Sequence, residues 1–122
     1  MKNEKCVSKK IDQCKQLIEA MGCKVDWIEN DIISVDYGLW QIIIDDNYPN
    51  DILLSLHVNI CPWKAADISK RLTYLASMIE MDVIIDDVYA FEFDENGNFM
   101  EITFGKDAYQ TVNREHYYGF YK

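Results

Sequence analysis

The sequence of 122 residues predicts a single α+β domain, residues 1–122, in which an antiparallel β-sheet meander carries helices mainly on one face. Two kinds of apolar periodicity support this prediction. Several short segments alternate apolar and polar residues between turn formers, as strands with one buried face do. Other segments repeat apolar residues every three or four positions, as amphipathic helices do. Together they predict the element order α-β-β-β-β-α-β-β-α.

The first element is a helix, followed by four strands. The apolar stripe of the helix is formed by Val7, Ile11, Cys14, Ile18 and Met21. Ser8 is its expected N-cap, and Gly22 is expected to end it. Strands are predicted at residues 24–29, 32–37, 40–45 and 54–60, and short turns between them indicate an antiparallel meander.

The second half of the chain is predicted to contain a helix, a hairpin and a last helix. Pro62 begins the helix, because a residue in the first helical turn loses no N–H bond when it is proline. Val83–Phe93 and Phe99–Phe104 form the hairpin, for which Asn96-Gly97 suits a two-residue type I′ turn. The last helix is expected at about Asp107–Tyr117.

The charge is unevenly distributed along the chain. The net charge is −9, yet residues 1–24 carry six lysines against three acidic residues. Residues 25–105 carry sixteen acidic residues against three basic ones. Such an acidic body repels phosphate backbones, so we expect no nucleic-acid partner. No apolar stretch is long enough to span or target a membrane, and we expect no membrane partner and a cytoplasmic location.

The order of elements resembles that of a known family. A first helix ending in glycine leads to a meander that carries Tyr37-Gly38 and Asp45-Asp46 beside a proline-containing turn. A helix, the segment Val83–Asp87 and the hairpin segment Phe91–Asp94 follow. In these features the chain resembles the YbjN-like proteins, whose fold is shared with type III secretion chaperones. The resemblance covers most of the chain and implies a dimer-forming scaffold that binds peptides or proteins without a cofactor. The Cys61-Pro62-Trp63 start of the middle helix and the aromatic tail depart from the family pattern.

Cys61 is the one candidate for a reactive group. It precedes Pro62 at a predicted helix N-terminus, where the helix dipole stabilises a thiolate, although a packed or capping thiol is the favoured interpretation. His57 lies four strand residues away, about 13 Å, which is too far for a catalytic pair. The sequence contains no catalytic constellation and no metal motif. We therefore expect no enzyme, no metal and no cofactor.

Aromatic side chains are the candidates for contacts with a partner. The residues chosen are Trp40, Trp63, Tyr117, Tyr118 and Phe120. Packing of the tryptophans in the core, and docking of the tail on its own domain, are the alternatives. Residues 119–122 form either a docked or a flexible tail.

The sequence favours a non-enzymatic module of chaperone-like fold that binds a protein or peptide segment. Two alternatives remain open. One is a small-molecule-binding or thiol-dependent domain with a pocket near Cys61 and Trp63. The other is a purely self-associating structural protein, which would form a homodimer.

Overall fold

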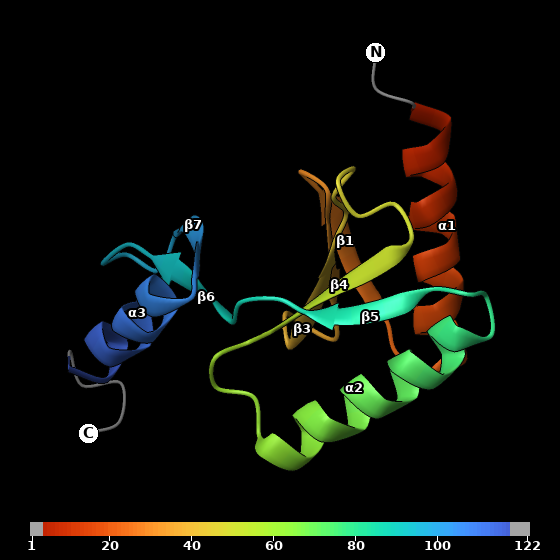
Figure 1. Ribbon diagram of the computed structural model, residues 1–122. Helices are drawn as coiled ribbons and strands as arrows, with labels where there is room; N and C mark the ends of the chain where they lie inside the picture. Colours follow the sequence, from red (N-terminus) through yellow and green to blue (C-terminus); the bar gives the residue numbers. More distant parts are fainter. Residues whose placement is uncertain (1–3, 118–122) are drawn as a thin grey trace.

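A computed structural model describes residues 4–117 of the chain and, within them, the side chains of residues 9–111 (Figure 1). The elements are α1 (Glu4–Ala20), β1 (Val25–Glu29), β2 (Ile32–Val35), β3 (Trp40–Ile43), β4 (Asp51–Leu56), α2 (Pro62–Ser77), β5 (Asp82–Ile85), β6 (Tyr89–Phe93), β7 (Phe99–Phe104) and α3 (Lys106–Tyr117). The predicted α+β class and order of elements are confirmed, with the predicted strand 83–93 divided into β5 and β6.

Five strands form one sheet in the order β1-β2-β3-β4-β5. The first four pair antiparallel, as the predicted meander requires. β5 instead pairs parallel to β4, with Ile52 opposite Val83 and Leu54 opposite Ile85. A parallel neighbour needs a long crossover, and α2 supplies it. The prediction of a purely antiparallel sheet is therefore wrong at β5.

Both α1 and α2 cover the same face of this sheet, and the core lies between them. The buried cluster comprises Cys14, Leu17, Ile18, Met21, Ile33, Val35, Trp40, Ile42, Ile44, Ile52, Leu54, Ile68, Leu72, Ala76 and Met81. The strand members alternate along β2, β3 and β4, because successive side chains of a strand point to opposite faces. The expected packing of helices mainly on one face therefore holds for α1 and α2.

The opposite face of the sheet carries a buried polar row. Ser34, Gln41 and Ser55 lie in register across β2, β3 and β4, and all three are fully buried. Ser55 Oγ donates a hydrogen bond to the carbonyl of Asp87, in the segment that links β5 to β6. The amide of Gln41 has no hydrogen-bond partner at either polar atom among the described residues. This face is thus covered, but its central polar side chain is left unsatisfied.

The strands β6 and β7 form a separate antiparallel hairpin that packs on α3. Ala90 of β6 and Ala108 of α3 are buried at this contact, and the hydroxyls of Thr103 and Thr111 lie 3.0 Å apart. Figure 1 shows the hairpin and α3 to one side of the five-stranded sheet, at the end of the connection from β5.

Tyr89 joins the hairpin to the five-stranded sheet. Its carbonyl accepts a hydrogen bond of 2.8 Å from the N–H of Val58, and its hydroxyl donates one to the carbonyl of Gly38. Its ring meets the ring of His57 edge to face, with 5.4 Å between centroids. Tyr89 is fully buried, so the hairpin is closely packed against the sheet at this junction.

Two local predictions are wrong in their bounds. Helix α1 begins at Glu4, so Ser8 lies inside the helix and is not its N-cap. Strand β4 begins at Asp51 and ends at Leu56, whereas residues 54–60 were predicted. The parallel pairing with β5 extends the strand to Asp51.

The turn of the β6–β7 hairpin is also not the expected type I′. That turn needs positive φ at both Asn96 and Gly97, and only Gly97 has it, at 85°. The Asp94 carboxylate instead accepts hydrogen bonds from the N–H groups of Asn96 and Asn98, at 2.9 and 2.8 Å. The aspartate side chain therefore sets a longer loop than the dipeptide alone predicts.

Candidate functional site

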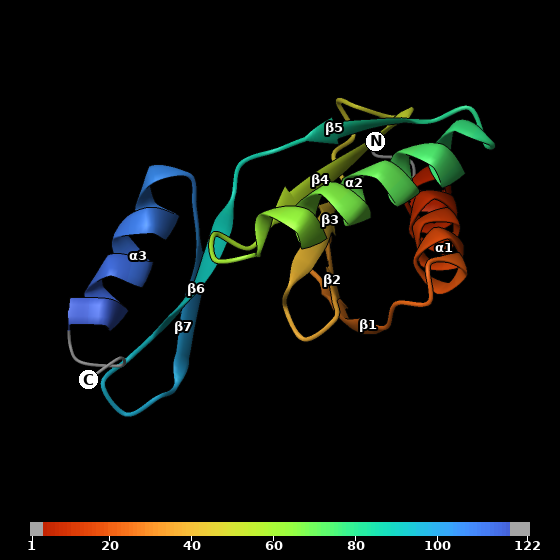
Figure 2. The same ribbon diagram turned by 90° about the horizontal axis from the view of Figure 1, so that it is seen from below.

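A cleft of about 970 Å³ lies between the β6–β7 hairpin and the β1–β2 end of the five-stranded sheet. Figure 2 shows the hairpin on one side and β1 and β2 on the other. The cleft is lined by Lys24, Val25, Asp26, Trp27, Glu29, Asn30, Ile32, Tyr37, Gly38, Phe91, Phe93, Phe99, Met100, Glu101 and Ile102. Its volume is at the upper end of the range of about 300–1,000 Å³ that ligand sites occupy.

The hairpin wall of the cleft is apolar and largely aromatic. Phe91 pairs with Ile102 and Phe93 pairs with Phe99, so these side chains share one face of the hairpin. The ring of Phe99 contacts Phe91 and Phe93 edge to face, with 6.1 Å between centroids in each pair. Phe93 is 50% exposed and Phe99 55% exposed. The hairpin therefore presents aromatic rings to solvent, while α3 packs on the hairpin near Ala90 and Thr103.

The sheet wall of the cleft is organised by Asp26. An irregularity in pairing between Val25 and Trp27 places Asp26 at a bulge of the edge strand β1. Its carboxylate accepts hydrogen bonds from Ser34 Oγ at 3.1 Å and from the N–H groups of Tyr37 and Gly38 at 2.9 Å each. These bonds fix the β2–β3 turn, where Asp36, Tyr37 and Gly38 all have positive φ.

Gly38 and Phe91 hold the two walls together at the bottom of the cleft. A Cβ on Gly38 would lie 2.5 Å from Cε2 of Phe91, so the ring rests directly on the glycine backbone. Burial, followed by the nearby charge of Asp26, raises the pKa of Tyr89 and keeps its hydroxyl protonated. Tyr89 can therefore act as the hydrogen-bond donor to Gly38 at any physiological pH.

The charged residues of the lining are mostly acidic. The lining includes the acidic residues Asp26, Glu29 and Glu101 and one basic residue, Lys24. Glu101 pairs with Glu92, so its side chain lies on the hairpin face opposite Phe91. Glu29 and Glu101 are exposed. The cleft thus combines an aromatic wall on the hairpin with a sheet wall that carries Asp26, Glu29 and Lys24.

The residues that were predicted as partner contacts lie in different parts of the structure. Trp40 is fully buried in the core and is not accessible to a partner, which corrects its selection as a contact residue. Its selection failed because strand β3 turns Trp40 toward α1 and α2. Trp63 is 71% exposed on α2, but it does not line the cleft. The side chains of Tyr117, Tyr118 and Phe120, and the tail 119–122, lie outside the described residues.

Neither Cys61 nor His57 lines the cleft. Cys61 is an exposed free thiol at the N-cap of α2 and makes no side-chain capping bond there. His57 is half-buried against Tyr89, and burial lowers its pKa. Burial is also the main cause that raises the pKa of the Cys14 and Cys23 thiols, each to about 11. These two thiols are thereby held in the unreactive protonated form at neutral pH.

Sequence reasoning missed Trp27, Phe93 and Phe99 as site residues. The alternation of Tyr89, Phe91 and Phe93 is visible in the sequence, and it correctly predicts a strand face. It does not say whether another element covers that face. The sequence did offer one signal for these residues. It predicts a hairpin with aromatic residues on both strands, and only one helix follows that could pack on it.

Comparisons of the chain with protein-family models, with curated proteins and with solved structures find no match. Among the residues that the structure describes, no group of three or more His, Cys, Asp or Glu side chains is arranged to hold a metal ion. No helix in the described part of the chain is long and apolar enough to cross a membrane.

Proposed function

We propose that this protein is a non-enzymatic binding module that holds a peptide or protein segment in the cleft between the β6–β7 hairpin and the β1–β2 end of the sheet. The observation that carries the proposal is the aromatic wall of the hairpin, which faces a preformed cleft and remains half exposed. The same role is implied by the resemblance to secretion chaperones noted in the sequence.

The energetics of the hairpin support a contact role for its aromatic residues. Phe93, Phe99 and Met100 are each at least half exposed, so their apolar area contributes little to folding. Contiguous exposed apolar surface rimmed by polar groups marks an interaction site. A bound segment would remove this area from water at about 25 cal/mol per Å².

The fixed geometry of the walls also favours binding. Asp26 fixes the β2–β3 turn by three hydrogen bonds, and Phe91 rests on Gly38. A site whose walls are already ordered loses less conformational entropy when it binds.

The chemistry of the lining favours binding over nucleophilic catalysis. The lining residues include no histidine, cysteine, serine or threonine. Cys61 and Trp63, around which the sequence suggested a second kind of pocket, lie on α2 outside this lining.

The experiment that tests the proposal is selection of peptides from a random display library on the purified protein. We expect enriched peptides rich in apolar residues, whose binding is lost in Trp27→Ser and Phe93→Ser. Trp63→Ser is the matched control, because Trp63 is an exposed aromatic residue outside the cleft. Binding that survives both cleft variants, or that is lost only with Trp63→Ser, would contradict the proposal. Sizing of the native protein and of Phe93→Ser would show whether the free protein is a homodimer and whether the dimer needs this cleft.

A further inference from the structure

The outward face of helix α2 differs in charge from the sheet and the hairpin, and this difference indicates a second interaction surface. We propose that this face docks an acidic amphipathic segment of a partner protein. Carboxylates of the segment pair with Lys64 and Lys70, and its apolar side chains pack on Trp63 and Tyr74. No residue of α2 lines the cleft, so the inference goes beyond the function proposed above.

The first observation is the exposure of large apolar side chains on α2 and at its end. Trp63, Tyr74 and Met78 are 71%, 66% and 68% exposed. Trp63 and Tyr74 lie about three helical turns apart, so both rings project from the same side of the helix. The opposite side buries Ile68 and Leu72. Side chains at this exposure add little to folding and are available for contact with a partner.

The second observation is the distribution of charge. The only lysines and arginines between residues 25 and 105 are Lys64, Lys70 and Arg71, and all three belong to α2. The helix contains one acidic residue, Asp67, whereas residues 25–61 and 78–105 contain fifteen acidic residues and no lysine or arginine. A small ligand at physiological salt responds to charges within about 8 Å, rather than to the net charge of the protein. The outward face of α2 is therefore a local positive surface.

The charges of this face are arranged so that two lysines supply its positive potential. Arg71 donates to the carboxylate of Asp67 at 3.5 Å and to the main-chain carbonyl just past α1 at 2.5 Å. Its charge thus offsets that of Asp67. Lys70 is exposed, and the ammonium group of Lys64 lies 5.9 Å from the centroid of the Trp63 ring. Positive charge and aromatic surface therefore adjoin on the outward face.

These observations together select the chemistry of the occupant. A purely apolar segment would cover the rings, but it would bring the ammonium groups of Lys64 and Lys70 out of water without a partner. A basic segment would be repelled by the same two groups. Carboxylates form charge-assisted hydrogen bonds with ammonium groups, which compensates for the lost water. An amphipathic helix with glutamates beside its apolar stripe presents both kinds of group along one face.

The test uses synthetic helical peptides of about 18 residues, long enough to form a helix. Leucines recur at three- and four-residue steps, the flanking positions are glutamate, glutamine or lysine, and the remaining positions are alanine. Binding to the whole protein is measured by fluorescence polarisation at physiological salt. We expect the glutamate peptide to bind about fivefold more tightly than the glutamine peptide, and the lysine peptide not to bind.

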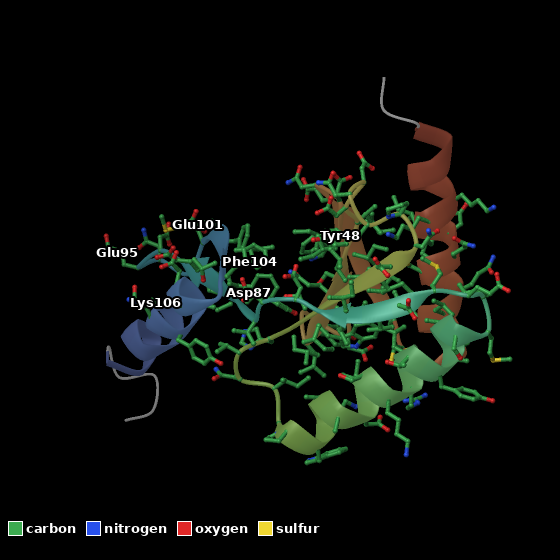
Figure 3. The ribbon with its side chains drawn as sticks, viewed as in Figure 1. Tyr48, Asp87, Glu95, Glu101, Phe104 and Lys106 are labelled. Carbon is green, nitrogen blue, oxygen red and sulfur yellow. The ribbon has the colours of Figure 1, made fainter. Side chains whose placement is uncertain are left out.

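Two double variants separate this face from the general charge of the protein. Lys64→Gln with Lys70→Gln is expected to weaken the glutamate peptide about fivefold and to leave the glutamine peptide unchanged. Lys9→Gln with Lys106→Gln removes the same charge from exposed positions on α1 and α3, and is expected to change neither peptide. Figure 3 shows Lys106 on α3, away from α2.

Aromatic variants separate this face from the cleft. Trp63→Ser is expected to weaken both the glutamate and the glutamine peptide, because it removes the apolar contact that they share. Tyr109→Ser is the matched control, since Tyr109 is 54% exposed on α3. Phe93→Ser, which alters the cleft, is expected to leave the glutamate peptide unchanged.

Four outcomes would overturn the inference. Equal binding of the glutamate and glutamine peptides, or equal losses in the two double variants, would show that the charge of α2 does not select the occupant. Loss of the glutamate peptide in Phe93→Ser but not in Trp63→Ser would place it in the cleft, which supports the proposed function and not this surface. If no peptide binds and sizing shows that Trp63→Ser converts a dimer into a monomer, a second copy of the chain covers the face instead.

Discussion

The five-stranded sheet and the β6–β7 hairpin use their apolar residues in opposite ways. In the sheet, Trp40, Ile42 and Leu54 are fully buried beneath α1 and α2. In the hairpin, Phe93, Phe99 and Phe104 are between 38% and 55% exposed. Figure 3 shows Phe104 beside Asp87, close to the connection between the two regions.

This difference teaches that the two regions are stabilised by different means. The sheet is held by a continuous core, whereas the hairpin is held by α3 and by the Tyr89 junction. A region with few buried apolar contacts opens more readily than the core does. This exposure is the reason why we propose a partner contact for the aromatic residues of the hairpin.

The largest expected effect contrasts one core residue with one hairpin residue. Leu54→Ala is expected to lower the free energy of unfolding by about 2 to 5 kcal/mol, because it leaves a cavity in a closed core. Phe99→Ala is expected to cost less than about 1 kcal/mol, because half of the ring is already in water. Urea denaturation of both variants measures the difference. Similar losses would mean that the hairpin belongs to the core, and the comparison would fail.

The next effect concerns the contact between the two regions. Gly38→Ala is expected to cost about 2 to 3 kcal/mol, because alanine is strained at φ 80° and its Cβ would meet the Phe91 ring. Gly97→Ala is the matched control: its φ is 85°, but a Cβ there has no atom within 4 Å, so about 1 kcal/mol is expected.

Hydrogen exchange locates the damage from Gly38→Ala. Amides of β6 and β7 are expected to lose protection, while those of β3 and β4 keep theirs, because the core strands do not depend on Phe91. In a Phe91→Ala background the added cost of Gly38→Ala should fall to that of Gly97→Ala. An unchanged cost there would show that the Phe91 ring does not rest on Gly38 as described.

The sequence predicts the sheet region better than it predicts the hairpin region. Alternation along β2, β3 and β4 gives both the strands and their buried faces, because a strand with one covered face has a period of two residues. The same alternation in Tyr89, Phe91 and Phe93 gives the strand but not the exposure of its face. Exposure depends on how far the segment after β5 carries the hairpin from the sheet, and no local pattern encodes that distance.

The parallel pairing of β5 and the place of Trp40 have similar explanations. β4 and β5 are joined by α2, and a helix between two strands is compatible with more than one pairing, so Val83–Phe93 was predicted as one strand of a hairpin. Trp40 and Trp63 are alike as residues, yet one lies on the covered face of β3 and the other on the outer side of α2. The cleft itself arises from tertiary contacts between residues such as Trp27 and Phe93, which lie far apart in the sequence.

A smaller, stabilising effect is expected on the polar face of the sheet. Gln41 is fully buried, and its amide oxygen and nitrogen have no partner among the described residues. Methionine has a similar shape and no polar group to satisfy, so Gln41→Met is expected to raise the free energy of unfolding by about 1 kcal/mol. Thermal melting measures the gain, and Ser55→Ala is the contrasting variant, since Ser55 donates to the carbonyl of Asp87 and its loss should destabilise. A loss of stability in Gln41→Met would show that the amide is satisfied in solution.

The smallest expected effect is a pH dependence at the junction of the two regions. Burial lowers the pKa of His57 below its ordinary value of 6.5, and the Nδ1 atom accepts a hydrogen bond of 3.1 Å from the N–H of Asn59. The unfolded chain therefore binds a proton more readily than the folded one. The stability that neutral His57 contributes is complete above pH 6.5 and is lost as the pH falls through the lowered pKa. Melting temperatures of the native protein and of His57→Gln are compared between pH 7.5 and pH 5, so that effects of pH common to both proteins cancel. The native protein is expected to lose more than the variant, with β6 amides losing protection first, because His57 contacts Tyr89. Parallel profiles would mean that the packing of Tyr89 on His57 does not depend on the neutral imidazole, and that the junction is held by the Tyr89 hydrogen bonds alone.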